Sequence, residues 1–69
     1  MWGIVVFVLL NHELVVHQPL TDYLIQKERY WSEKDCREAI ERFMPDVEVR
    51  IRMDKNTTDY FLKCSPLSH

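Results

Sequence analysis

The sequence predicts a small α+β protein in which a mostly antiparallel sheet of four or five strands carries one helix on one face, in the order ββ(β)αββ. Three observations predict this class: an unbroken apolar run at residues 2–10, a capped amphipathic segment at residues 32–45 and strict alternation at residues 47–53. The chain has 69 residues, so residues 1–69 make a single domain, with residues 65–69 as a frayed tail. A domain this short usually needs a disulfide, a metal or a second copy of itself to be stable.

The apolar run at residues 2–10, WGIVVFVLL, predicts a central β-strand. As a helix it would cover only about half of a bilayer core. No positive charge precedes it and no small-residue cleavage pattern follows it, which argues against a secretion signal. Its β-branched and aromatic residues fit a strand, and alternation makes both of its faces apolar. Such a strand belongs in the middle of a sheet.

The next segments predict a hairpin and then an ambiguous stretch. Asn11 and His12 form a tight turn because Asn tolerates positive φ, and residues 13–17 form the second strand, which ends before Pro19. In residues 20–31, Thr21 could cap a short helix, whereas the aromatic and β-branched residues favour extended structure. We expect an irregular third strand there, and the helical alternative stays open.

Residues 32–45 predict a surface helix that lies on the sheet. Ser32 is an N-cap residue, Asp35 completes a capping-box-like pattern, and Pro45 stops the helix. The apolar positions follow at i, i+3, i+4 and i+7 and form one narrow stripe: Cys36, Ala39, Ile40 and Phe43.

The last part of the chain predicts a second hairpin. In residues 47–53, VEVRIRM, alternation turns Val47, Val49, Ile51 and Met53 inward and the charged residues outward. Residues 54–58 are then a turn or loop, and residues 59–64, DYFLKC, are the partner strand.

One narrow helix cannot cover both faces of the first strand. Val5, Phe7 and Leu9, or else their alternates, would be left against water as part of an apolar patch of several hundred Å². Packing against a second copy would bury that patch. We therefore expect a homodimer whose interface contains Val5, Phe7 and Leu9.

The residue types that catalysis and cofactor binding need are scarce. A single glycine excludes a phosphate loop, a dinucleotide fingerprint and a nucleophile elbow. His12 and His17 are five residues apart on a hairpin and point to opposite faces, so we expect no metal site. The acidic residues of the predicted helix are where capping and solvation place them. We expect no cofactor and no enzymatic activity.

A partner-binding surface is expected on the outer face of the second hairpin. Arg50, Arg52, Phe61 and Lys63 would form a basic and aromatic patch of the kind that single-stranded nucleic acid uses. Glu48 and Asp59 dilute it, and the net charge of −2 with a pI near 5.8 argues against a general nucleic-acid binder. A protein partner is the preferred interpretation.

Cys36 and Cys64 are too few for a disulfide framework, and their spacing matches no zinc motif. We expect two buried, reduced cysteines, because a bridge between them would persist only in an oxidising compartment. Together with the missing secretion signal, this indicates a cytoplasmic protein outside the membrane.

The segment YWSEKDCREA, residues 30–39, with the apolar first strand, resembles short uncharacterised proteins of phages and marine bacteria. Those proteins have an opening apolar strand, a hairpin, and an aromatic-x-Ser/Thr step into a helix with Cys and Ala. The resemblance implies no activity and carries over no functional residue. The hypothesis is a non-enzymatic interaction protein, homodimeric through an apolar sheet face and meeting a protein partner. The alternative is a single-stranded nucleic-acid-binding module.

Overall fold

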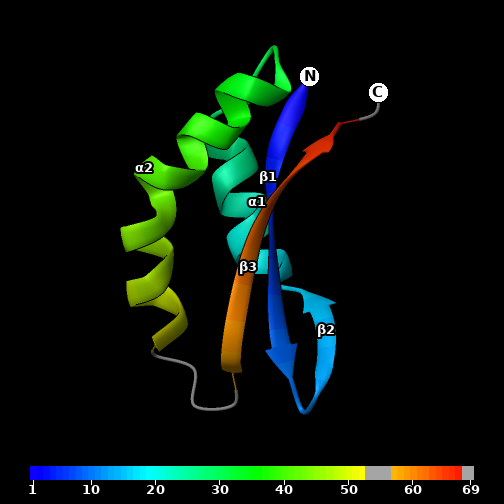
Figure 1. Ribbon diagram of the computed structural model, residues 1–69, viewed down its shortest axis with the longest axis vertical. Helices are drawn as coiled ribbons and strands as arrows, with labels where there is room; N and C mark the ends of the chain where they lie inside the picture. The colour runs from blue at the N-terminus through cyan, green and yellow to red at the C-terminus, as the bar shows by residue number, and fades with distance from the viewer. Residues whose placement is uncertain (53–56, 68–69) are drawn as a thin grey trace.

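The computed structural model describes residues 1–52 and 57–67, which form a three-stranded antiparallel sheet and two helices. The element order is ββααβ (Figure 1). The predicted sheet of four or five strands with a single helix is therefore wrong, because two segments expected as strands are helical. The elements are β1 (Trp2–Leu10), β2 (Glu13–Val16), α1 (Gln18–Lys27), α2 (Glu33–Arg52) and β3 (Thr57–Pro66).

The position of β1 in the middle of the sheet is confirmed. The strand order is β2-β1-β3, and β1 runs antiparallel to both neighbours. The tight turn at Asn11 and His12 is confirmed as well, since these residues have φ values of 50° and 69°. Two consecutive positive φ values are what a two-residue hairpin needs to match the strand twist.

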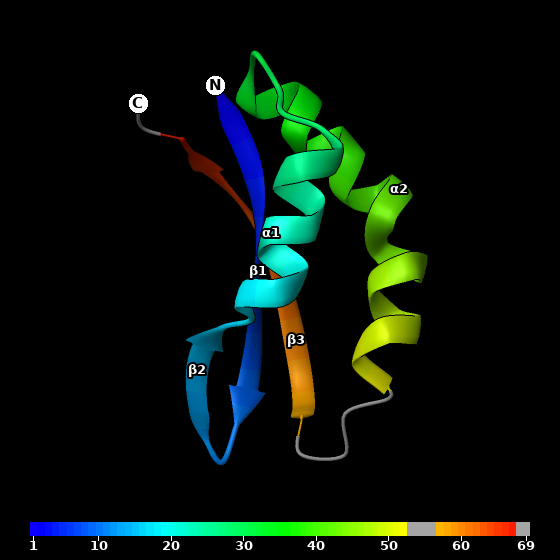
Figure 2. The ribbon, with the colours of Figure 1, turned by 180° about the vertical axis from the view of Figure 1, so that it is seen from behind.

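Both helices cover the same face of the sheet. Ile4, Val6 and Val8 alternate along β1 and are 0–3% exposed. Figure 1 shows α1 behind β1, Figure 2 shows it in front of β1 from the opposite side, and both show α2 alongside β3. The helices supply the rest of the core from their buried sides: Leu20, Leu24, Cys36, Ala39, Val47 and Ile51.

The first correction is α1, which replaces the expected irregular third strand at residues 20–31. His17 is its N-cap, and the His17 Nδ1 atom accepts a hydrogen bond from the backbone N–H of Leu20 at 3.3 Å. Pro19 lies in the first turn, where a missing N–H costs nothing. The buried Thr21 hydroxyl accepts from the backbone N–H of Val6 at 3.0 Å. Because β2 ends at Val16, this bond satisfies a β1 donor that would otherwise be buried without a partner.

The second correction is the length of α2, which continues through Pro45 to Arg52. Its start is confirmed, since the Ser32 Oγ atom accepts from the backbone N–H of Asp35 at 3.1 Å. Val47 and Ile51 extend the buried stripe at i, i+4 spacing, and Val49 between them is 65% exposed. Figure 1 shows α2 changing direction along its length, as a helix that contains proline does. The strand expected at residues 47–53 is therefore absent from the part of that range that the structure describes.

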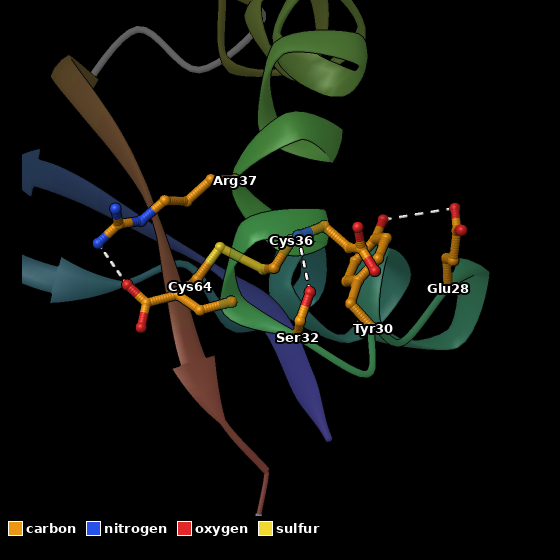
Figure 3. The surroundings of a disulfide bond; sticks show 8 residues. Glu28, Tyr30, Ser32, Cys36, Arg37 and Cys64 are labelled. Atoms are coloured by element: carbon orange, nitrogen blue, oxygen red, sulfur yellow. Dashed lines mark hydrogen bonds and ion pairs between the residues drawn. A yellow bond between two sulfur atoms is a disulfide. The ribbon is translucent and has the colours of Figure 1, made fainter.

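The third correction concerns the cysteines, which form a disulfide. Cys36 of α2 and Cys64 of β3 are joined with a Cα–Cα distance of 6.0 Å, and Cys36 is fully buried (Figure 3). The expectation of two reduced cysteines is wrong because the final strand pairs with β1 and not with residues 47–53. That register places Cys64 opposite Ile4, on the face that α2 covers. The disulfide thereby fastens α2 to the sheet.

The strand β3 extends into the segment expected as a tail. The strand expected at residues 59–64 is found as the longer β3, which includes Ser65 and Pro66. The backbone N–H of Leu67 donates to the Met1 carbonyl at 2.8 Å. Of the expected turn at residues 54–58 and the tail at residues 65–69, residues 53–56 and 68–69 lie outside the described residues.

Replacing both cysteines by serine should lower the free energy of unfolding by about 3–4 kcal/mol, because the bridge closes a loop with a sequence separation of 28. Urea titration followed by circular dichroism measures this change. Dithiothreitol should produce a similar loss in the native protein and none in the Cys36→Ser/Cys64→Ser variant. Equal stability of the oxidised protein and the variant would contradict the prediction.

Candidate functional site: the outer sheet face

The face of the sheet turned away from the helices is apolar. The alternation that buries Ile4, Val6 and Val8 turns the intervening β1 residues to the opposite side. Residues paired directly across an antiparallel ladder share a face, so Leu14, Val16 and Phe61 lie on this side too. We call this surface the outer sheet face; its apolar residues are Val5, Phe7, Leu9, Leu14, Val16 and Phe61.

The helices leave the outer sheet face uncovered. Leu14 is 57% exposed, Val16 44% and Phe61 51%, whereas the β1 residues between them are partly shielded by these neighbours. Figure 2 shows α1 in front of β1 and α2 beside β3, and buried residues of both helices join the core formed by Ile4, Val6 and Val8. A contiguous apolar patch of several hundred Å² is at the upper end of what monomeric soluble proteins expose.

The outer sheet face ends near Gly3. A Cβ atom added there would lie 3.0 Å from a Leu67 methyl group and 3.2 Å from the Ile25 Cγ1 atom. These distances are shorter than ordinary van der Waals contacts. The absence of a side chain at Gly3 therefore lets Leu67 and Ile25 approach the strand. The uncovered apolar surface therefore begins at Val5 and extends toward the hairpin end of β1.

The interface residues predicted from the sequence lie together. Val5, Phe7 and Leu9 all lie on the outer sheet face, and the alternates Ile4, Val6 and Val8 lie in the core. The sequence also predicts that neighbours on the second strand extend this patch, and the structure identifies them as Leu14 and Val16. The apolar composition of residues 14–16 within a hairpin is the signal that indicates them.

The predicted basic and aromatic surface is not assembled. Arg50 and Arg52 belong to α2, whereas Phe61 and Lys63 lie on β3 and face away from the helices. The Arg50 guanidinium is 4.3 Å from the centre of the Tyr23 ring, and its Nε atom is 3.4 Å from Asp46. The nucleic-acid alternative thus lacks the single surface on which it depends.

The two histidines in the described part of the chain lie in different local settings. His12 is exposed in the hairpin turn and His17 caps α1. In the described part of the chain, no three His, Cys, Asp or Glu side chains are grouped as metal ligands would be. A groove of about 500 Å³ beside the exposed Trp31 contains Glu28 and Arg42, whose charged atoms are 3.5 Å apart. The Tyr30 hydroxyl, which lines the same groove, donates to the Glu28 carboxylate at 3.4 Å.

A second polar contact fastens α2 to β3. The Tyr60 hydroxyl donates to the Glu48 carboxylate at 2.5 Å. This hydrogen bond, followed by partial burial, raises the pKa of Tyr60 above its ordinary value, because the neutral phenol is the form that donates. Burial is the main cause that raises the pKa of Tyr30, and the nearby Glu28 carboxylate adds to it.

No family model, curated protein or solved structure matches the chain. Within residues 1–52 and 57–67, neither helix is long and apolar enough to cross a membrane.

Replacing Tyr60 by phenylalanine should lower the free energy of unfolding by about 1 kcal/mol at neutral pH. A tyrosine whose pKa is raised on folding stabilises the protein fully below its unfolded pKa of about 10, and this contribution is lost as the pH rises through the folded pKa. Between about pH 9 and 11, the stability of Tyr60→Phe should therefore fall less steeply than that of the native protein. Urea titrations across this range measure both slopes, and parallel slopes would disprove the assignment.

Proposed function

We propose that the protein is a non-catalytic interaction protein that self-associates through the outer sheet face. The observation that supports this proposal is the placement of both helices on one side of a sheet whose central strand is apolar on both sides. Burial of apolar surface away from water is favourable, and the free energy gained grows with the area buried. Covering the outer sheet face would give β1 the two-sided shelter that its composition favours.

A second copy of the chain is the occupant that fits this face best. Sheets pack face to face at a spacing of about 10 Å when both present flat apolar surfaces, and a second copy supplies the same surface. Three strands about 4.8 Å apart and up to about 30 Å long give a flat area of roughly 400 Å² per copy. Two such faces bury roughly 800 Å² in total, which is the size of a weak, transient interface, so we expect a dissociation constant in the micromolar range or weaker.

The disulfide supports a compartment other than the cytoplasm expected from the sequence. Cytosolic thiol systems keep most cysteines reduced, and stable structural disulfides persist in oxidising compartments. Cys36 is fully buried and its bridge fastens α2 to β3, which is a structural role and not an exposed redox role. We therefore propose that this self-associating protein works in an oxidising compartment.

Val16→Glu and Phe61→Glu should each weaken self-association at least tenfold, because each places a carboxylate in an apolar interface. Both side chains are already about half exposed in the single chain, so the fold should survive. Light scattering and sedimentation equilibrium from about 1 to 200 μM measure the change. The matched control is Val49→Glu, which adds the same charge at a 65% exposed position on α2 and should leave assembly unchanged. A native protein that stays monomeric throughout this range would refute the proposal.

If the protein works in an oxidising compartment, it should accumulate intact only where the Cys36–Cys64 disulfide can form. Expressed in a bacterial cytoplasm, the protein should be largely reduced and more susceptible to proteolysis than when it is directed to the periplasm. Alkylation of free thiols before and after reduction, read by mass shift on a gel, gives the oxidised fraction. Cys36→Ser/Cys64→Ser should be equally susceptible in both locations. Full protease resistance of the reduced chain would contradict this expectation.

A further inference from the structure

On the outer sheet face, one row of paired residues separates two flanking rows, and each flanking row contains one charged residue. Val16, Phe7 and Phe61 are paired across the three strands and form one row perpendicular to them. On one side of this row lie Leu9 and Asp59, which are paired with each other, and on the other side lie Val5 and Lys63, which are also paired. Each flanking row therefore joins an apolar β1 residue to a β3 charge, and the two charges have opposite signs; the Leu9 row also includes Leu14 of β2.

From this arrangement we infer that the dimer is isologous, with its two-fold axis along the row Val16–Phe7–Phe61. The inference rests on the proposed self-association and specifies its geometry. A two-fold axis that lies between the sheets and perpendicular to the strands reverses the strand direction and keeps the strand order. Each β3 then lies over the partner's β3, and Phe61 lies over the same residue of the second copy.

This axis turns the charges of β3 into complementary pairs. Asp59 of each copy lies over the position that Lys63 occupies in the other, and the two contacts are equivalent by symmetry. On β1, Leu9 lies over the position of Val5, so apolar residues of this strand also meet. A two-fold axis that runs along β1 would instead place β3 over the partner's β2, so Asp59 would lie over an apolar leucine and neither β3 charge would meet an opposite charge.

The charges are available for such contacts. Asp59 and Lys63 are both exposed, and four residues along a strand separate them by about 13 Å, which is too far for an ion pair within the chain. One Asp59 oxygen accepts from the backbone N–H of Tyr60 at 2.8 Å, and the carboxylate keeps a second oxygen. Within residues 1–52 and 57–67, Lys63 forms no ion pair.

Two charge-reversal variants test this geometry. Each variant should dimerise poorly alone, and the two should dimerise well when they are mixed. Asp59→Lys gives a chain with two lysines on β3, and Lys63→Asp gives a chain with two aspartates. In a homodimer of either variant, both symmetric contacts join like charges, so we expect at least tenfold weaker self-association at low salt. In a mixture of the two variants, both contacts join opposite charges. We therefore expect a heterodimer of near-native affinity.

Fluorescence anisotropy with one labelled variant measures the mixture, and sedimentation measures each variant alone. Raising the salt from about 20 to 500 mM should reduce both the homodimer defect and the heterodimer gain, because exposed charges are screened. The doubly exchanged chain Asp59→Lys/Lys63→Asp should dimerise like the native protein. Circular dichroism melting of each variant establishes that it is folded.

The control variants carry the same charge changes away from the outer sheet face. Glu41→Lys and Lys34→Asp lie at exposed positions of α2, and each should self-associate normally, alone and in a mixture. If the native protein does not self-associate, the proposed function fails. If it does, and if Asp59→Lys and Lys63→Asp each dimerise normally or gain nothing from mixing, the two-fold geometry is overturned and the proposed function stands.

Discussion

The structure depends on the two-sided apolar character of β1. Its even-numbered residues Ile4, Val6 and Val8 form the centre of the core, and its odd-numbered neighbours are equally hydrophobic. A strand of this kind is stable only in the middle of a sheet, which fixes β2 and β3 on either side. It also leaves the fold with one apolar face more than its helices cover. Self-association is the proposed consequence of that excess.

The second constraint is the attachment of α2 to β3. A chain of this length has a small core, and α2 packs on it along one buried stripe that continues past Pro45. The Cys36–Cys64 disulfide lies toward one end of the contact, and the hydrogen bond from Tyr60 to Glu48 lies toward the other. With both ends fastened, α2 is held on the inner face of the sheet.

The sequence was informative where a single local signal dominated and misleading where two signals competed. The length and composition of residues 2–10 sufficed for β1, and Ser32 sufficed for the start of α2. Residues 47–52 satisfy a strand by alternation and a helix by the i, i+4 spacing of Val47 and Ile51, and tertiary burial chose the helix. The helix α1 depends on tertiary bonds as well, since the Thr21 hydroxyl is useful only where β2 ends beside it. The apolar outer face of β1 followed from alternation and its β2 neighbours from the hairpin, whereas Phe61 depended on a pairing of β3 with β1 that the sequence does not reveal.

Assembly and stability are coupled in such a molecule. If the outer sheet face is buried only in a dimer, each copy completes the hydrophobic shelter of the other, and the apparent stability of the chain rises with its concentration. The stabilisation by the disulfide does not depend on protein concentration, because the bridge acts within a single chain by restricting its unfolded state. A small domain that has both devices can stay folded when dilute and still gain from association. The outer sheet face is then free to carry binding specificity, because the monomer does not need it in order to fold.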